Sequence, residues 1–328
     1  GTNWTGISPV NSASLYNCYG VAWNGTIWVA VGEGSNGGNN IAYSSNGTQW
    51  TTIGNNIINQ SCYGIAWNGK MFIAVGLGQQ NIMAYSYNGT DWTGLGISVF
   101  DNFCNGVAWN GIMFVAVGTG NGNTLAYSYN GTDWNGLGKK TFTSDGRGVS
   151  WNGTKWIAVG NGGNTIAYSS DGINWTGGGK KTFTGIGYGV ESNTLWVAVG
   201  GGYDANSNPD KNIAYSTDGL TWTGIAGTIM ESISAVKWNG TMWVAGGYGG
   251  NVLVYSYNGV NWTGIDSVNS KLSTCYGLAW NGSMWMAVGS PISNVSAIVY
   301  SLDGIVWNSS NLSINYMYTV KGVAWNGT

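Results

Sequence analysis

The feature that most constrains the fold is a repeat. A unit of roughly 42 to 45 residues recurs along the 328-residue chain, a length that fits four short strands and their turns. Its anchor is a Trp-Asn-Gly turn, with a degenerate copy, Glu191-Ser192-Asn193-Thr194, in repeat five. The intact copies begin at Trp23, Trp67, Trp109, Trp151, Trp238, Trp280 and Trp325. Such regularity predicts one tandem-repeat domain over residues 1–328 rather than two unrelated domains.

Each repeat contains four candidate strands separated by Gly or Asn turns. In repeat one they are residues 20–23, 27–31, 40–44 and 50–53. The second and third strands are almost continuously apolar, which indicates a sheet covered on both faces. A ring of stacked sheets provides that cover without leaving a bare apolar face, so the pattern predicts an all-β propeller.

The two ends of the chain do not complete a repeat. There are seven second and seven third strands, but an extra fourth strand is expected at residues 1–7 and an extra first strand at 319–328. We therefore predict seven complete four-stranded blades. Eight blades, or a section of a longer repeat array, are the alternatives.

The turn between the third and fourth strands reads Ser-x-(Asp/Asn)-Gly-x-x-Trp in every repeat. The copies are Ser44–Trp50, Ser86–Trp92, Ser128–Trp134, Ser169–Trp175, Ser216–Trp222, Ser256–Trp262 and Ser301–Trp307. This motif resembles the Asp-box, or BNR, repeat of sialidase-like propellers, which implies the same fold. Asp-box sialidases hold their substrate with three arginines, whereas this chain has only Arg147, so the resemblance does not extend to sialidase activity.

Composition removes most enzyme classes. The chain has no histidine, only 7% charged residues and a formal charge of -2, so acid–base chemistry is scarce and no positive field attracts nucleic acid. No apolar run is long enough to span a membrane. We expect no catalytic residues; the alternative is a hydrolase centred on Glu191, which stands where other repeats have Ala or Ser.

One loop is a candidate metal site. In repeat five, oxygen-bearing side chains occupy alternate positions at Asp204, Asn206, Asn208 and Asp210, a spacing that can surround calcium. Pro209 and the absence of a distal Glu differ from an EF-hand loop, so a plain polar loop is the alternative. No other cofactor is expected.

Basic residues are concentrated in one part of the sequence. Six of the eleven lie between 139 and 181, and they are Lys139, Lys140, Arg147, Lys155, Lys180 and Lys181. Such a patch predicts an acidic partner or an anionic glycan, against the alternative of a solvated charge run.

The cysteines share one repeat position. Cys18, Cys62, Cys104 and Cys275 each immediately precede a first strand and are expected to line one arc of a central channel. Disulfides between neighbouring inner strands and free thiols remain open alternatives.

Fifteen Asn-x-Ser/Thr sequons indicate a glycoprotein, against the alternative that Asn-Gly-Thr is simply good turn chemistry. The preferred attachment sites lie at turn tips or outside the repeat consensus. They are Asn24, Asn59, Asn152, Asn239, Asn281, Asn308 and Asn311.

Taken together, these features predict a non-enzymatic structural glycoprotein module of the cell exterior or a virion surface, within a fibre or coat and in contact with other copies or segments of it. The alternative is a lectin-like propeller whose Trp and Tyr rings stack on sugars at repeated weak sites. The lectin is favoured if the Trp of the Trp-Asn-Gly turn and Tyr87, Tyr129 and Tyr257 are exposed in equivalent pockets. The structural role is favoured if these rings are packed between blades.

Overall fold

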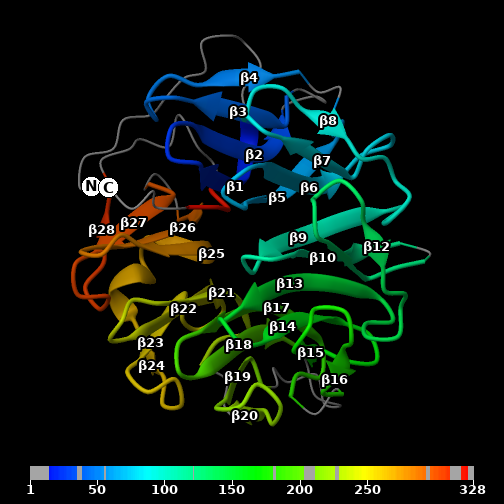
Figure 1. Cartoon of the computed structure of the whole chain (residues 1–328). Coiled ribbons are helices and arrows are strands. Elements are labelled where there is room, and N and C mark those ends of the chain that lie inside the picture. Colours follow the sequence, from blue (N-terminus) through cyan, green and yellow to red (C-terminus); the bar gives the residue numbers. More distant parts are fainter. Residues whose placement is uncertain are drawn as a thin grey trace. The chain divides into compact units, whose positions relative to one another are not determined.

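A computed structural model describes residues 15–34, 39–54, 57–120, 122–179, 182–202, 211–225, 229–292, 296–310 and 319–323. The chain divides into two compact units. The N-terminal unit comprises Ile7–Ala158 and Ser169–Thr176, and the C-terminal unit comprises Gly1–Gly6, Val159–Tyr168 and Gly177–Thr328. Figure 1 shows the strands of both units.

The described residues form seven antiparallel groups of four strands, one for each predicted repeat. The strands of repeats one to four are β1 (Leu15–Trp23), β2 (Trp28–Gly34), β3 (Ile41–Ser44), β4 (Thr51–Ile53), β5 (Ser61–Trp67), β6 (Phe72–Leu77), β7 (Met83–Ser86), β8 (Thr93–Gly94), β9 (Phe103–Trp109), β10 (Phe114–Thr119), β11 (Leu125–Ser128), β12 (Asn135–Gly136), β13 (Asp145–Trp151), β14 (Trp156–Asn161), β15 (Ile166–Ser169) and β16 (Thr176–Gly177).

The strands of repeats five to seven follow the same order. They are β17 (Ile186–Ser192), β18 (Trp196–Gly201), β19 (Ile213–Ser216), β20 (Thr223–Ile225), β21 (Ser232–Trp238), β22 (Trp243–Tyr248), β23 (Leu253–Ser256), β24 (Thr263–Gly264), β25 (Leu272–Trp280), β26 (Trp285–Pro291), β27 (Ile298–Ser301) and β28 (Asn308–Ser309). A single turn of 3-10 helix, η2 (Asp266–Val268), precedes β25. The predicted four strands per repeat are therefore confirmed.

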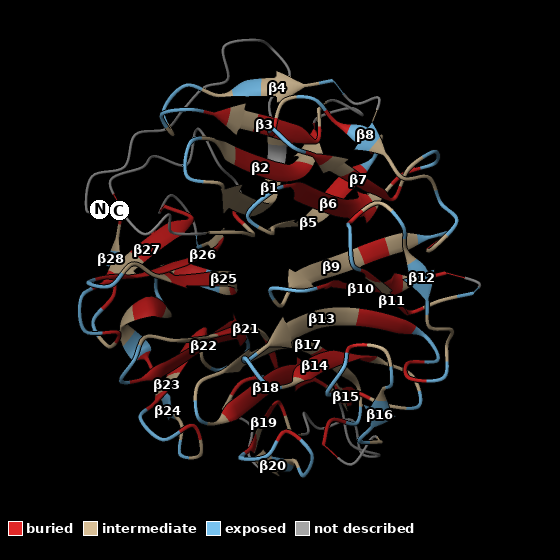
Figure 2. Cartoon of the chain, in the orientation of Figure 1, coloured by how far each residue is buried: buried red, intermediate tan, exposed pale blue. Residues whose placement is uncertain are grey.

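The second and third strands form the core of each repeat. In β6, β10 and β14 the first five residues are all buried, as Figure 2 shows for these central strands. Residues that alternate along such a strand pack with different neighbours. In β6, Phe72 and Ala74 share a core with Val29 of the repeat before, whereas Ile73 and Val75 share one with Phe114 of the repeat after. Continuous apolar sequence thus reflects cover on both faces, as predicted.

Within each unit, consecutive repeats are joined along their strands. Single bridges join Glu33 to Ser61, Leu77 to Phe103 and, in the C-terminal unit, Gly201 to Ser232. These bridges place the first strand of one repeat beside the second strand of the repeat before it.

The extra first strand expected at 319–328 is only partly within the described residues. The Val320 N–H donates to Gly289 O at 3.1 Å, and Val320 and Val323 pack against Val288 and Ile298. No strand is assigned to 319–323. This segment nevertheless lies against β25 and β26, where a next repeat would begin. The extra fourth strand at 1–7 lies outside the described residues.

No helix in the part of the chain that the structure describes has the length and apolar character needed to cross a membrane.

Candidate functional site

The motif turns hold themselves together with their own side chains. In each copy the Ser Oγ accepts the Gly N–H at 2.8 Å, as Ser128 does from Gly131. The Asn or Asp Oδ1 accepts the N–H groups two and three residues later, and the Trp Nε1 donates to the Gly carbonyl, as Trp134 does at 3.0 Å. These hydrogen bonds use the Ser, Asn or Asp, and Trp side chains of the motif for structure.

The first strands contain a more variable position. A register shift follows the cysteine position in six of the described pairings, at Cys18/Gly20, Cys62/Gly64, Cys104/Gly106, Gly187/Gly189, Ile233/Ala235 and Cys275/Gly277. The residue skipped by this bulge is a tyrosine in four repeats, at Tyr19, Tyr63, Tyr188 and Tyr276. In two others it is Asn105 or Ser234. Bulges re-aim a side chain away from the regular ladder, so these positions are the best candidates for a specific site.

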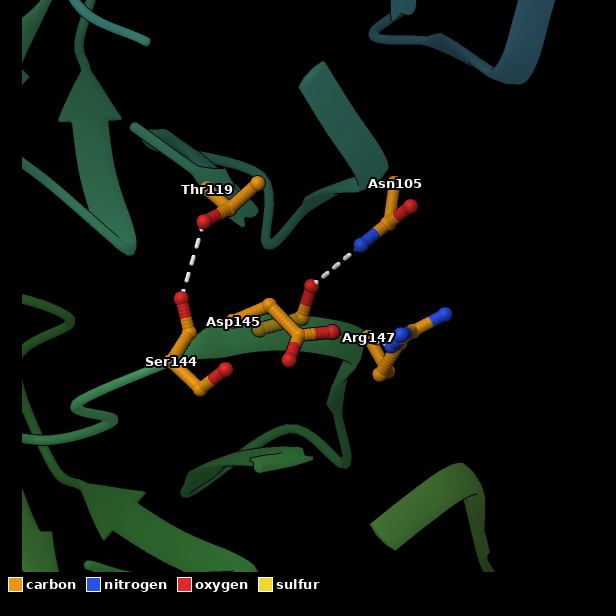
Figure 3. Close-up of polar contacts among 6 residues, drawn as sticks. Asn105, Thr119, Ser144, Asp145 and Arg147 are labelled. Atoms are coloured by element: carbon orange, nitrogen blue, oxygen red, sulfur yellow. Dashed lines mark hydrogen bonds and ion pairs between the residues drawn. The ribbon is translucent and has the colours of Figure 1, made fainter. Parts of the chain in front are cut away.

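In the N-terminal unit, the bulge positions and their neighbours form a polar cluster around β13. Thr119 Oγ1 donates to Ser144 O at 2.8 Å, and Asn105 Nδ2 donates to Gly146 O at 2.7 Å. These bonds fix the backbone on both sides of Asp145. Figure 3 shows the Asp145 carboxylate directed toward Arg147.

Asp145 and Arg147 form an ion pair through Asp145 Oδ2 and Arg147 Nε. The Asp145 side chain is 5% exposed, whereas the Arg147 side chain is 35% exposed. The carboxylate and the Nε edge are therefore enclosed, and the outer part of the guanidinium remains accessible. In the sequence Arg147 belongs to a group of basic residues, and its buried partner is not apparent there.

A second set of side chains lies on β1, β2 and β5. Tyr19 hydroxyl donates to Glu33 Oε2 at 3.0 Å, and Asn17 Nδ2 donates to the same oxygen at 3.2 Å. The Tyr19 and Tyr63 rings meet edge to face at 5.6 Å. Burial, followed by the Glu33 hydrogen bond, raises the pKa of Tyr19, and burial raises the pKa of Tyr63. Both phenols are therefore neutral donors at ordinary pH.

Glu191, the candidate centre of a hydrolase, has a basic partner. Lys237 Nζ lies 2.9 Å from Glu191 Oε1. The two residues occupy β17 and β21, which are first strands of consecutive repeats in the C-terminal unit. A glycosidase site requires a second carboxyl group, and the side chain bound to Glu191 is a lysine instead.

The predicted basic patch is spread over β13. Lys139 and Lys140 precede the start of β13, and Lys155 follows its end. A seven-residue strand spans about 20 Å, so Lys155 lies at the opposite end of β13 from Lys139 and Lys140. Lys180 and Lys181 lie outside the described residues.

The four cysteines are free thiols, so the disulfide alternative is not realised. Cys62, Cys104 and Cys275 have no exposed surface. They pack into the cores that link consecutive repeats, with Cys62 beside Ile58 and Phe72. The expectation that they line a channel is wrong for these three, because each side chain points into the apolar layer beside the bulge. Burial raises the pKa of Cys275 to about 12.

The calcium candidates Asp204, Asn206, Asn208 and Asp210 lie outside the described residues. Elsewhere, in the described ranges, no group of three or more His, Cys, Asp or Glu side chains is arranged to hold a metal ion.

The sequons occupy two kinds of turn. At the tips between first and second strands, Asn24, Asn152, Asn239 and Asn281 use Oδ1 to accept N–H groups two and three residues later. Asn59 accepts the Gln79 N–H at 2.8 Å, and Asn308 is exposed on β28. Asn311 lies outside the described residues.

The aromatic residues divide into two groups. Turn tryptophans such as Trp67 and Trp109 are half-buried, with ring centroids 4.5 Å from Phe72 and Phe114. In contrast, Tyr87, Tyr129 and Tyr257 are 54%, 57% and 63% exposed. Each stands edge to face against the tyrosine two residues earlier. The tryptophans and the tyrosines therefore differ in exposure, and this discriminator does not decide between the two hypotheses.

Comparison with known proteins identifies the fold. No family model matches the chain, and no curated protein matches its sequence. Among solved structures, the computationally designed Ika8 protein matches with a TM-score of 0.52 at 11% identity, covering 95% of this chain and 100% of that chain. The WD40 β-propeller domain of Doa1 gives 0.53 at 9% identity, covering 95% and 98%.

A chain of the mitotic checkpoint complex gives a TM-score of 0.55 at 14% identity, covering 79% of each chain. These likenesses establish a β-propeller fold, and the seven four-stranded groups of described residues fit seven blades. At such low identity they carry no information about activity.

Proposed function

We propose that this propeller is a non-enzymatic structural glycoprotein module of the cell exterior or a virion surface, where it associates with other copies or segments of a fibre or coat. The observation that carries this proposal is the geometry of the turn-tip asparagines. Kinship with Asp-box propellers is part of the same proposal, supported by the turn hydrogen bonds of the seven motif copies.

At Asn24, Asn152, Asn239 and Asn281 one side-chain atom stabilises the turn and another is left for glycan attachment. Oδ1 accepts two backbone N–H groups at 2.6 to 3.0 Å, whereas Nδ2 has no partner among the described residues. A glycan is attached through Nδ2, so it can be added without breaking the turn. At the motif positions Asn88 and Asn130, by contrast, Nδ2 donates to Asp91 and Asp133 at 2.7 and 2.8 Å.

The chain contains matched controls for this geometry. Asn68 and Asn110 accept the same two N–H groups, yet Lys70 and Ile112 stand where a sequon needs Ser or Thr. The turn is therefore independent of glycosylation, and occupancy can be tested without changing the fold.

The test is to secrete the chain from eukaryotic cells and map glycans by peptide mass. We expect occupancy at Asn24, Asn152, Asn239 and Asn281, and none at Asn88 or Asn130. Ile112→Thr should add one glycan, at Asn110, because Ile112 is 69% exposed. A protein from its natural source with the bare 34.5 kDa mass of the chain would contradict the glycoprotein proposal.

Carbohydrate binding is a second candidate function, favoured by the exposed tyrosines. Tyr87 and Tyr129 each adjoin a motif turn with an exposed Asn and Asp, which supplies an aromatic face next to hydrogen-bonding groups for sugar hydroxyls. Ser45 and Ser170 occupy the same motif position in repeats one and four. Tyr87→Ser/Tyr129→Ser should therefore leave the fold intact and abolish glycan-array binding, and unchanged binding would exclude these sites.

A further inference from the structure

We propose that Arg147 forms a binding site for the carboxylate of an acidic sugar, a uronate, beside the bulge at Asn105 of the N-terminal unit. This inference goes beyond the structural function proposed above and does not depend on glycosylation. It rests on how the guanidinium is held, on which of its atoms are used, and on what lies beside it.

The guanidinium is held by a buried anchor. Asp145 is 4% exposed, and its Oδ2 contacts Nε of Arg147. The Asp145 backbone is fixed on either side because Thr119 binds Ser144 O and Asn105 binds Gly146 O. Gly146 fits closely, because a Cβ there would lie 2.8 Å from the Val117 side chain. The strand cannot shift without disturbing repeat three.

This anchor occupies only one edge of the guanidinium. Arginine has five N–H donors in a fixed fork, and Asp145 engages Nε, which leaves the two terminal nitrogens on the accessible part of the side chain. Their spacing matches the two oxygens of a carboxylate. Because Nε is already fixed, less side-chain entropy is lost when a ligand binds.

The neighbouring groups favour a hydroxylated acid over a simple anion. Asn105 lies on the adjacent first strand, and its Nδ2 donates to Gly146 O. Figure 3 shows its amide oxygen on the opposite side of the amide from this hydrogen bond. That oxygen can accept a sugar hydroxyl. Asp145 balances the charge of Arg147. A ligand with several negative charges is therefore disfavoured, whereas a single carboxylate is compatible.

The test measures binding of glucuronate, with glucose as the matched probe that lacks the carboxylate, by isothermal titration calorimetry. We expect glucuronate to bind with a dissociation constant on the order of 1 mM and glucose not to bind. Arg147→Lys, which keeps the charge but loses the fork, should weaken binding by about tenfold or more. Lys140→Gln, at an exposed lysine, should leave it unchanged.

Loss of Arg147 alone would leave Asp145 buried without a partner and could reduce folding. The double variant Arg147→Gln/Asp145→Asn replaces the pair with neutral groups of similar size and should fold, as judged by its melting temperature, yet not bind glucuronate. The proposal is overturned if wild-type protein fails to bind glucuronate at 20 times that expected constant (about 20 mM), if glucose binds equally, or if either Arg147 variant binds unchanged.

Discussion

At the scale of single residues, the motif turn accepts Asn and Asp because its task is to accept hydrogen bonds. Asn130 receives the N–H groups of Thr132 and Asp133, and Asp218 receives those of Leu220 and Thr221 at similar distances. The difference is the charge of the acceptor. The backbone N–H groups of Thr221 and then Leu220 lower the pKa of Asp218 to about 2.

This difference predicts a pH effect. The folded pKa of Asp218 is below the unfolded value of about 3.9, so its contribution to stability is present above pH 4 and is lost as pH falls toward 2. The pKa values of Asp171 and Asp303 are also lowered. The wild-type urea concentration at half-unfolding should fall between pH 5 and pH 2. In the triple variant Asp171→Asn/Asp218→Asn/Asp303→Asn this fall should therefore be smaller. An unchanged pH profile would contradict this account.

One of the two ion pairs among the described residues follows a rule that is visible in the repeats. Glu191 and Lys237 occupy the same position in consecutive repeats, where the others carry mainly Ala, and they bind one another. Asn105 and Arg147 likewise share one position in consecutive repeats. Comparing the same position between neighbouring repeats would have predicted the first pair. The Asp145–Arg147 pair could not be found this way, because its geometry depends on the backbone at the start of β13.

At the scale of elements, the apolar second and third strands were predicted closely because burial on both faces leaves a direct trace in sequence. In repeat one, β2 and β3 begin within one residue of the predicted bounds. The first strand was less accurate: β1 begins five residues earlier than expected. A bulge changes the direction of side chains but leaves no trace in the pattern of apolar residues. Its position, and the direction of the cysteine side chains, were therefore not apparent from the sequence.

Substitution of the glycine in the Ser-x-(Asp/Asn)-Gly-x-x-Trp turn can test how tightly consecutive repeats pack. Gly131 has φ 81°, and a Cβ there would lie 2.7 Å from Met71 Sδ. Gly111 has φ 96°, with no atom within 4 Å of its Cβ position. Both Ala variants incur backbone strain of about 1 kcal/mol, but Gly131→Ala should lose roughly 1–3 kcal/mol more from overpacking. Urea unfolding measures the difference, and equal losses would show that the contact is unimportant.

At the scale of the whole molecule, the repeats are coupled unevenly. Bridges join repeats one to three into one hydrogen-bonded assembly, and another bridge joins repeats five and six. In repeat proteins, stability is approximately the sum of the repeats and the interfaces between neighbours. Cooperative unfolding is therefore expected to follow these shared strands and cores more closely than the identity of the repeated sequence.

The buried thiols can report this coupling. Cys62 and Cys104 lie in the bridged repeats two and three, whereas Cys275 lies in the C-terminal unit. Each should resist alkylation at pH 8 in the native state, because a buried thiol with a raised pKa is neither accessible nor ionised. Across a urea series followed by mass spectrometry, Cys62 and Cys104 should become reactive at the same midpoint, because neither repeat can open without breaking the strand and core that they share. Cys275 can become reactive at a different urea midpoint, because it lies in the C-terminal unit. Separate midpoints for Cys62 and Cys104 would mean that each repeat opens by itself, and that the bridge between β6 and β9 contributes little to cooperativity.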